Sequence, residues 1–303
     1  MPCGKGFGGL TAWKRMPVAA MVLPALFLIS GESKALSDIE IVLSSSRIAQ
    51  GECGTVLVRT EKGKQPYVRW LGGPVFLVPE SEGKGWYGFL GVDLSADPGK
   101  AYLEVDLSPS GEKQRAELTV VAKDWGVRVL TLPKAMVEPD KKTMDRVKKE
   151  SRIMEETLKT PSSAPRWNGP FKRPLEGEVV GPFGRRSIIN ELPRSPHSGV
   201  DLRAAKGTPV QSIHNGKVVL VGEHFFSGKS VVIDHGGAIQ SMYFHLEKIL
   251  VEKGEEVAGG QVIGLVGATG RATGPHLHFG MRVNGARVDP MQVILLSEQM
   301  GRP

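Results

Sequence analysis

The stretch Thr269-Gly-Arg-Ala-Thr-Gly-Pro-His-Leu-His-Phe279 carries two histidines, His276 and His278, inside a strand-like segment, Pro275–Val283. Successive side chains of a β-strand point to opposite faces, so these two imidazoles are expected on one face. Two imidazoles on one face can serve one metal ion or one reacting centre, whereas the alternative is a chance pair of surface histidines. All seven histidines of the chain lie between His197 and His278, and this clustering favours a site in that part of the chain.

A second pattern, His197-Ser-Gly-Val-Asp201, places an imidazole and a carboxylate four residues apart. Pro196 and Gly199 disfavour a helix here, so we expect a loop that leads into a strand. Imidazole and carboxylate ligands both suit Zn²⁺. A zinc ion held by two histidines and one carboxylate keeps a fourth position open for water, which distinguishes a catalytic zinc site from a closed structural one.

A third pattern, Tyr243-Phe-His245-Leu, ends another strand-like segment, Ile239–Phe244. Because Tyr243 and His245 are two residues apart, they are expected on the same face. A neutral histidine near a metal can accept a proton from bound water. The alternative is a core histidine whose hydrogen bonds are satisfied within the fold.

The C-terminal part of the chain, residues 167–303, is rich in glycine and in short strand-like segments. Asn215-Gly216 and Asn284-Gly285 are hairpin signals, because both central residues of a type I′ turn need positive φ. These features predict a mainly β domain. The expected strands are 209–213, 217–221, 230–234, 239–244, 261–266 and 275–283.

Residues 38–130 also consist of short strand-like segments separated by Gly, Pro, Asp or Ser, and they contain no histidine. This pattern is typical of a small sandwich, and we predict an immunoglobulin-like β domain. Residues 131–166 are rich in Lys, Arg and Glu, with apolar residues at helical spacing before Pro161-Ser-Ser-Ala-Pro165. They predict a charged helix and a linker, which is either a solvated connector or an arm that positions the two domains.

Residues 1–35 have the pattern of an export signal. A basic segment precedes the apolar run Met16–Ile29, and Ser33-Lys-Ala35 offers small residues for cleavage. The run is too short for a stable membrane span, unless the signal stays uncleaved as an anchor. We therefore expect an exported protein of the periplasm or cell envelope.

The formal net charge of +7 favours polyanionic partners such as nucleic acid, anionic membrane or an anionic wall polymer. The sequence has no RNP-like motif, no basic helix with heptads and no zinc-finger spacing, so nucleic acid is disfavoured as a partner. Cys3 would leave with the signal, so Cys53 is the single remaining cysteine and no internal disulfide is expected.

Residues 177–290 resemble the lysostaphin/LytM-type zinc peptidases of peptidoglycan. The order, the spacing and the flanking glycines of six stretches agree with that family. These stretches are His197–Leu202, Gly207–Val210, Val232–Gly236, Tyr243–Leu246, Gly260–Gly264 and Thr269–Phe279.

The resemblance implies a role for each candidate residue. His197, Asp201 and His278 would be the metal ligands for one Zn²⁺ per chain. His245 and His276 would be the catalytic pair, which activates water and stabilises the tetrahedral intermediate without binding the metal.

The resemblance also implies an activity and a layout. The activity is that of a zinc metalloendopeptidase that hydrolyses peptide cross-links of peptidoglycan, with the D-alanyl–diaminopimelate bond as the expected target. The layout is an export signal, an immunoglobulin-like sandwich, a charged helix and an antiparallel β peptidase domain, and it is similar to that of some Gram-negative members. By analogy with those members, the N-terminal domain is expected to inhibit the peptidase by folding over its cleft.

Two other functions fit parts of the sequence. Many relatives have lost one or more of the five site residues and act as non-catalytic, wall-binding activators of other peptidoglycan hydrolases, whereas this chain retains all five. Gly254–Gly264 is similar to the hairpin of biotinyl or lipoyl carrier domains. Such carriers need a lysine at an exposed turn tip, and no lysine follows Lys253, so this function is disfavoured.

Overall fold

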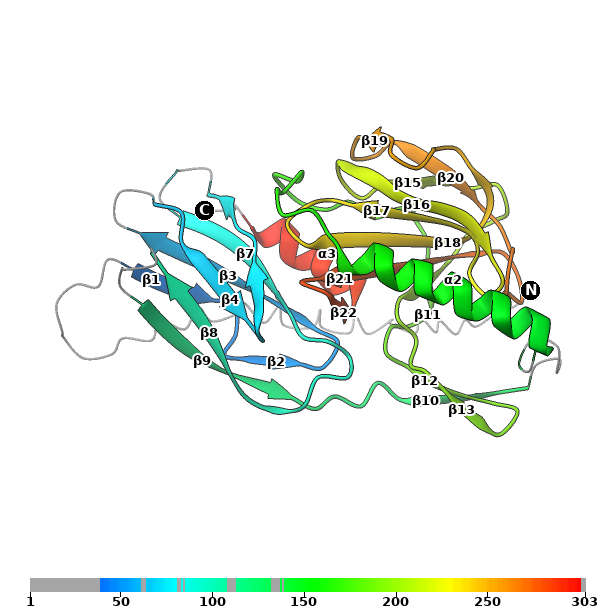
Figure 1. Ribbon diagram of the computed structural model, residues 1–303, viewed down its shortest axis with the longest axis horizontal. Coiled ribbons are helices and arrows are strands. Elements are labelled where there is room, and N and C mark those ends of the chain that lie inside the picture. Colours follow the sequence, from blue (N-terminus) through cyan, green and yellow to red (C-terminus); the bar gives the residue numbers. More distant parts are fainter. Residues whose placement is uncertain are drawn as a thin grey trace, which may run out of the picture.

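The computed structural model describes residues 39–60, 64–80, 83, 85–107, 113–131, 137 and 139–300. The expected export signal, residues 1–35, lies outside the described residues. The described chain is mainly β, as the sequence predicts. It forms a sandwich, a connecting segment and a larger β domain, and the sandwich and the larger domain lie next to each other (Figure 1).

The N-terminal part is a pair of sheets that share one hydrophobic core. The first sheet has the order β1-β3-β7-β6, formed by β1 Ile39–Leu43, β3 Cys53–Thr60, β7 Gly85–Gly91 and β6 Val78–Pro79. The second has the order β2-β9-β8-β4-β5, formed by β2 Arg47–Ala49, β9 Lys113–Val121, β8 Gly99–Asp106, β4 Tyr67–Trp70 and β5 Gly73–Val75. The shared core joins Leu90 of the first sheet to Leu103 of the second, both fully buried. This arrangement is a sandwich, while the immunoglobulin-like assignment stays a prediction.

The segment that follows β9 contributes a strand to the C-terminal part of the protein. β10 (Val127–Leu130) leaves the sandwich and pairs in parallel with β12 (Arg186–Ile189). β12 in turn pairs in antiparallel fashion with β13 (Leu192–Arg194). Three short strands therefore form a separate small sheet, and one of them, β10, lies within residues 38–130, the expected bounds of the N-terminal sandwich.

The expected charged helix is confirmed as α2 (Lys141–Lys159). It begins after Asp140, whose carboxylate accepts a hydrogen bond from the Thr143 backbone N–H at 2.7 Å, a typical N-cap. Leu158 is buried in a cluster with residues of the large sheet, and Glu150 accepts from the Phe225 backbone N–H at 2.8 Å. The helix is therefore docked on the C-terminal domain and is not a solvated connector.

The C-terminal part is built on a ten-stranded antiparallel sheet. Its main path runs β11-β14-β21-β18-β17-β16-β19, while β20 pairs with β15 and β18, and β22 pairs with β21. The bounds are β11 Val179–Gly181, β14 Val200–Arg203, β15 Pro209–Gln211, β16 Gly216–His224, β17 Gly228–Asp234, β18 Ile239–Ile249, β19 Glu256–Val257, β20 Val262–Val266, β21 His276–Val283 and β22 Ala286–Val288. The six expected strands are all present, whereas the sequence does not predict β11, β19, β22 or the final helix α3 (Pro290–Gln299). No helix among the described residues is long and apolar enough to cross a membrane.

The two Asn-Gly turn signals have different outcomes. Asn284 and Gly285 have φ angles of 53° and 80°, as a type I′ turn requires, and they join β21 to β22. The prediction is wrong at Asn215-Gly216, where neither residue has positive φ. The Asn215 side-chain oxygen instead accepts from the Gly259 backbone N–H at 2.9 Å, so this residue holds a neighbouring loop.

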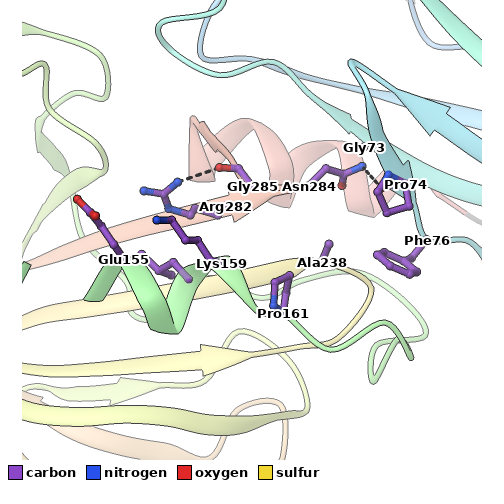
Figure 2. A pocket seen from close by; sticks show the side chains of 11 residues that line it. Gly73, Pro74, Phe76, Glu155, Lys159, Pro161, Ala238, Arg282, Asn284 and Gly285 are labelled. Carbon is purple, nitrogen blue, oxygen red and sulfur yellow. Dashed lines mark hydrogen bonds between the residues drawn. The ribbon is translucent and has the colours of Figure 1, made fainter. Parts of the chain in front are cut away.

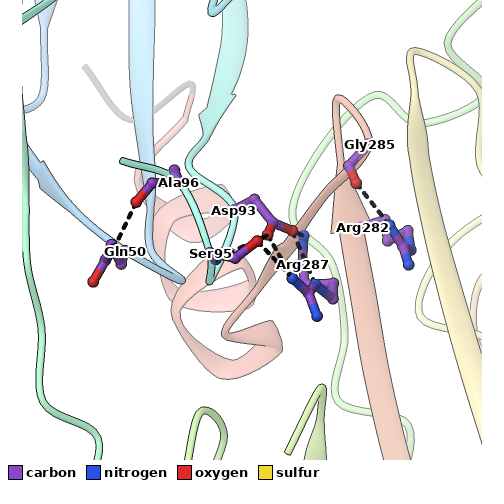
Figure 3. Close-up of polar contacts among 7 residues, drawn as sticks. All are labelled: Gln50, Asp93, Ser95, Ala96, Arg282, Gly285 and Arg287. Carbon is purple, nitrogen blue, oxygen red and sulfur yellow. Dashed lines mark hydrogen bonds and ion pairs between the residues drawn. The ribbon is translucent and has the colours of Figure 1, made fainter. Parts of the chain in front are cut away.

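The sandwich is joined to the C-terminal domain by an ion pair and by close backbone packing. Asp93 accepts from the backbone N–H of Arg287 at 2.8 Å and from its guanidinium at 2.6 and 3.0 Å (Figure 3). Gly91 lies so close to Val283 that an added Cβ would be 2.5 Å from the Val283 carbonyl oxygen. The two parts are therefore packed as one body. The close approach of the Gly91 and Val283 backbones requires glycine at position 91.

Beside this interface lies a cavity of about 480 Å³ between the sandwich, α2 and the β21–β22 hairpin (Figure 2). Phe76 lines it from the sandwich, Glu155 and Lys159 line it from α2, and Arg282 lines it from β21. The Arg282 guanidinium donates to the Gly285 carbonyl at 2.8 Å. No histidine of the chain is among the lining residues, so this cavity is separate from the predicted site.

Candidate metal centre

Three of the predicted site residues meet where β14 lies beside β21. Asp201 of β14 is the register partner of His278 of β21, and His197 lies in the loop that leads into β14. Asp201 Oδ1 lies 3.0 Å from His197 Nε2 and 3.0 Å from His278 Nδ1, and these two ring nitrogens lie 3.0 Å apart. The pairing of two strands thus brings His278 beside residues that are 77 and 81 positions earlier in the chain.

Hydrogen bonds determine which ring nitrogen faces this cluster. His197 Nδ1 lies 3.0 Å from the Pro182 carbonyl oxygen, which can only accept, so Nδ1 carries the proton and Nε2 offers its lone pair. His278 turns its Nδ1 toward the Asp201 carboxylate. Ligand atoms around a tetrahedral Zn²⁺ with bonds of about 2.0–2.1 Å lie about 3.3 Å apart, which is close to the separations found here. The donor set and its spacing therefore fit a zinc ion.

The protonation states of these residues also suit a cation. Burial alone would raise the pKa of Asp201, but the adjacent His197 and His278 rings lower it well below its ordinary value, so the carboxylate is ionised. Burial lowers the pKa of His278, an effect that the hydrogen bond to Asp201 partly offsets. An ionised carboxylate and a neutral imidazole are the forms that bind a metal.

His245 and His276 lie beside the cluster, with their ring centroids 4.8 Å apart. His245 Nδ1 lies 2.8 Å from the Thr269 carbonyl oxygen and His276 Nδ1 lies 2.9 Å from that of Gly274, so Nε2 is the unprotonated nitrogen of each neutral ring. His276 Nε2 lies 3.8 Å from Asp201 Oδ1. Burial lowers the pKa of His245 to about 4, so this ring is neutral near pH 7 and can accept a proton.

The expectation that Tyr243 and His245 share a face is wrong. Tyr243 is fully buried in the core, where its hydroxyl accepts from the Ile213 backbone N–H at 3.1 Å. His245 has a φ of 62°, and the register of β18 shifts just after it. This left-handed conformation breaks the strand alternation, so His245 faces the site and Phe244 stacks on the His278 ring at 5.3 Å. Backbone strain of this kind is concentrated at functional sites.

The other three histidines lie outside the cluster. His235 is fully buried, and its ring nitrogens lie within hydrogen-bond distance of Asn215 and Ser241. His214 packs edge-on against the ring of Phe171. His224 lines a neighbouring groove of about 450 Å³, together with residues of α2.

The cluster of His197, Asp201 and His278 and the pair of His245 and His276 all line one groove of about 460 Å³. The small sheet of β10, β12 and β13 lines part of it with Arg128, Leu130, Ser187, Ile189 and Arg194. Segments 226–227 and 271–273 line another part. None of the lining residues comes from the described sandwich, residues 39–121. The expected inhibition by the N-terminal domain therefore stays a prediction.

The sequence does not single out the groove arginines at positions 128, 194 and 271. They come from three segments that are distant in sequence, and their only shared signal is charge. The strand pairing that brings two of them together is not a property of either segment alone.

Comparisons with known proteins assign this part of the chain to a family. Residues 195–290, which contain all five site residues, match the model of Peptidase family M23. The crystal structure of a putative peptidase M23 from Pseudomonas aeruginosa is 35% identical in sequence, covers 82% of this chain and 95% of that chain, and has a TM-score of 0.65. The antiparallel sheet with its His-Asp-His cluster is a metallopeptidase domain. The chain belongs to peptidase family M23.

Three curated relatives have peptidoglycan or peptidase activities in their names. Peptidoglycan DD-endopeptidase ShyB of Vibrio cholerae is 42% identical over 129 residues, which are 43% of this chain and 27% of that protein. Peptidoglycan DD-endopeptidase ShyA of the same species is 48% identical over 98 residues, 32% of this chain and 23% of that protein. DD-carboxypeptidase/endopeptidase Mpg of Neisseria meningitidis is 40% identical over 122 residues, 40% of this chain and 28% of that protein. The chain thus spans about a quarter of the length of these relatives.

Proposed function

We propose that this protein is a zinc metalloendopeptidase that hydrolyses peptide cross-links of peptidoglycan, with the D-alanyl–diaminopimelate bond as its target. The observation that carries the proposal is the donor set of His197, Asp201 and His278 beside His245 and His276, each of which bonds a backbone carbonyl through Nδ1 and leaves Nε2 for the reaction. Three protein ligands leave a fourth position for water, and a neutral histidine beside it supplies a base. The two Vibrio relatives named as peptidoglycan DD-endopeptidases support the substrate.

Each side chain has a distinct task in this proposal. A bound zinc ion supplies Lewis acidity, which polarises the scissile carbonyl and makes water more acidic. His245 accepts the water proton at Nε2, because its Nδ1 already donates to the Thr269 carbonyl. His276 faces the developing oxyanion with its Nε2, because its Nδ1 already bonds the Gly274 carbonyl, and a proton on that Nε2 would stabilise the oxyanion.

The site of action follows from the substrate. Peptidoglycan lies outside the inner membrane, and residues 1–35 have the pattern of an export signal. We therefore propose that the mature chain begins near Leu36 and acts in the periplasm or cell envelope. N-terminal sequencing of the protein from fractionated cells tests this, and full-length protein found only in the cytosol contradicts it.

Digestion of purified muropeptides tests the reaction. The zinc-loaded chain should convert cross-linked dimers to monomers, as seen by mass spectrometry, and should leave glycan strands whole. His245→Ala and His276→Ala should each slow cleavage by roughly 10²-fold or more, because each removes an acid–base or oxyanion-stabilising group. A wild-type protein that contains zinc and leaves dimers intact, but binds sacculi and stimulates another hydrolase, would instead be a non-catalytic activator.

Metal analysis tests the ligands separately from the rate. Asp201→Ala and His278→Ala should lose the zinc, because three protein ligands leave little redundancy. His245→Ala should retain it and serves as the matched histidine control. If His245→Ala loses zinc as thoroughly as His278→Ala, the assignment of ligands is wrong.

A further inference from the structure

A row of polar side chains crosses the small sheet that lines the groove. Arg128 of β10 is the register partner of Ser187 of β12, and Ser187 is the register partner of Arg194 of β13. Register partners on neighbouring strands project to the same face of a sheet. All three residues line the groove that contains the metal centre, and Arg128 Nε donates to the Ser187 hydroxyl at 2.9 Å.

A third arginine joins this row from a different segment. Arg271 precedes β21 and lines the same groove, with its guanidinium 4.3 Å from the centre of the Phe226 ring. Its backbone N–H donates to the Phe226 carbonyl at 2.8 Å, which holds the segment in place. Burial lowers the pKa of Arg271, and the nearby charges of Arg194 and Arg128 lower it further. The three guanidinium groups are therefore close enough to repel one another.

Nothing in the described part of the chain neutralises these charges. Among the described residues, no ion pair joins any of the three arginines to a carboxylate. Arg194 donates from Nη2 to the Val137 carbonyl at 3.3 Å, and its Nε is buried without a hydrogen-bond partner. A buried donor without a partner is costly, and a guanidinium is well matched to a carboxylate by two parallel hydrogen bonds. The groove thus presents unused, charged donors to whatever binds beside the metal.

We propose that Arg128, Arg194 and Arg271 form a subsite that binds a free carboxylate of the substrate peptide, so that the enzyme selects acidic cross-links over amidated ones. This inference rests on the proposed function. The diaminopimelate of the target bond carries a free carboxylate on the carbon that bears the scissile amide nitrogen, and the D-glutamate of the stem peptide carries another. Either carboxylate supplies the planar anionic group that the three donors suit.

Three dimeric muropeptides test the subsite with the full, zinc-loaded chain. One has all carboxylates free, one has the diaminopimelate carboxylate amidated, and one has the D-glutamate carboxylate amidated. Removing the charge that the subsite binds should lower kcat/KM by about 10- to 100-fold, as expected when charge-assisted hydrogen bonds are lost. The dimer that shows the loss identifies the carboxylate. Equal kcat/KM on all three dimers would overturn the subsite and would leave the peptidase function intact.

Arginine variants provide the second arm. We expect a higher KM for the acidic dimer in Arg194→Gln and in Arg271→Gln. Neither variant should change KM further for the dimer in which the carboxylate bound by the subsite is amidated. The zinc content should stay the same. Arg69→Gln, at an exposed position of β4 in the sandwich, is the charge-matched control and should change neither value. Variants that slow both dimers equally would indicate a structural role and would overturn the subsite.

Binding measurements test recognition of the carboxylate separately from catalysis. Calorimetric titration of the same dimers into the zinc-loaded chain should show tighter binding of the acidic form. If the wild type cleaves no dimer but still prefers the acidic one, the proposed reaction fails while the carboxylate subsite stands. If affinity does not depend on amidation, the subsite fails whatever the protein does to the bond.

Discussion

Acidification should weaken the C-terminal domain through His235, a buried histidine that lies outside the candidate metal centre. Its ring is fully buried, with Nδ1 2.8 Å from the Asn215 carbonyl oxygen and Nε2 2.7 Å from the Ser241 hydroxyl. The carbonyl fixes the proton on Nδ1, so Nε2 accepts from Ser241. Protonation of His235 would place a charge in the buried core, and Nε2 would no longer be a hydrogen-bond acceptor. Burial accordingly lowers the pKa of His235 to about 4.

The size and sign of the effect follow from this pKa. An unfolded histidine titrates near pH 6.5, so between about pH 6.5 and 4 the unfolded chain binds a proton that the folded chain does not. Stability is therefore lost as the pH falls through this window. At about 1.4 kcal/mol per pH unit, the free energy of unfolding should fall by roughly 3 kcal/mol once the pH reaches 4.

Urea denaturation of the full chain at several pH values between 7.5 and 4 measures this loss. His235→Gln offers a donor and an acceptor but does not titrate, so its free energy of unfolding should fall by roughly 3 kcal/mol less than that of the wild type over the window. The other histidines contribute equally to both proteins, and their effect cancels in the difference. His214→Gln, which removes a half-buried histidine, serves as the control and should keep most of the wild-type pH dependence. Identical pH dependence in the wild type and His235→Gln would refute the reasoning.

Three further predictions concern the sandwich and its interface. Asp93→Asn removes the partly exposed ion pair with Arg287 and should lower the free energy of unfolding by about 1–2 kcal/mol in urea denaturation. If the sandwich inhibits the peptidase, this variant should also cleave dimers faster, and an unchanged rate would count against inhibition. Gly91→Ala should lower the free energy of unfolding by about 1–3 kcal/mol in the same assay, because the new Cβ would press on the Val283 carbonyl. An unchanged free energy of unfolding would show that the interface can shift. Burial raises the pKa of the Cys53 thiol, so a thiol reagent should label Cys53 slowly in the native protein and quickly in urea, as mapped by mass spectrometry; rapid native labelling would contradict this.

Features that depend on neighbours in sequence are predictable from the sequence alone. The alternation of a strand places His276 and His278 together beside Asp201. The charged, helical pattern within residues 131–166 becomes α2. Asn284-Gly285 forms its hairpin because both residues adopt positive φ readily.

Predictions failed where the local pattern did not contain the deciding information. Asn215-Gly216 has the same composition as the hairpin signal, but its asparagine side chain bonds a loop that lies 44 residues later in the chain. Tyr243 and His245 alternate as residues of a regular strand would, but the positive φ of His245 interrupts the alternation. That conformation is stabilised by surrounding contacts, including the bond of His245 to the Thr269 carbonyl 24 residues away.

Local sequence patterns were enough to predict the β class and the charged helix, and they pointed to five residues that the structure brings to one groove. The pairing of β10 with β12, which puts Arg128 beside Ser187, 59 residues later, is visible only in the folded protein. The period of a strand specifies which of its residues share a face, because that depends on the backbone alone. The pairing and the register of strands depend on which strand edges and apolar faces the rest of the chain leaves exposed. Pairing is therefore a property of the whole fold.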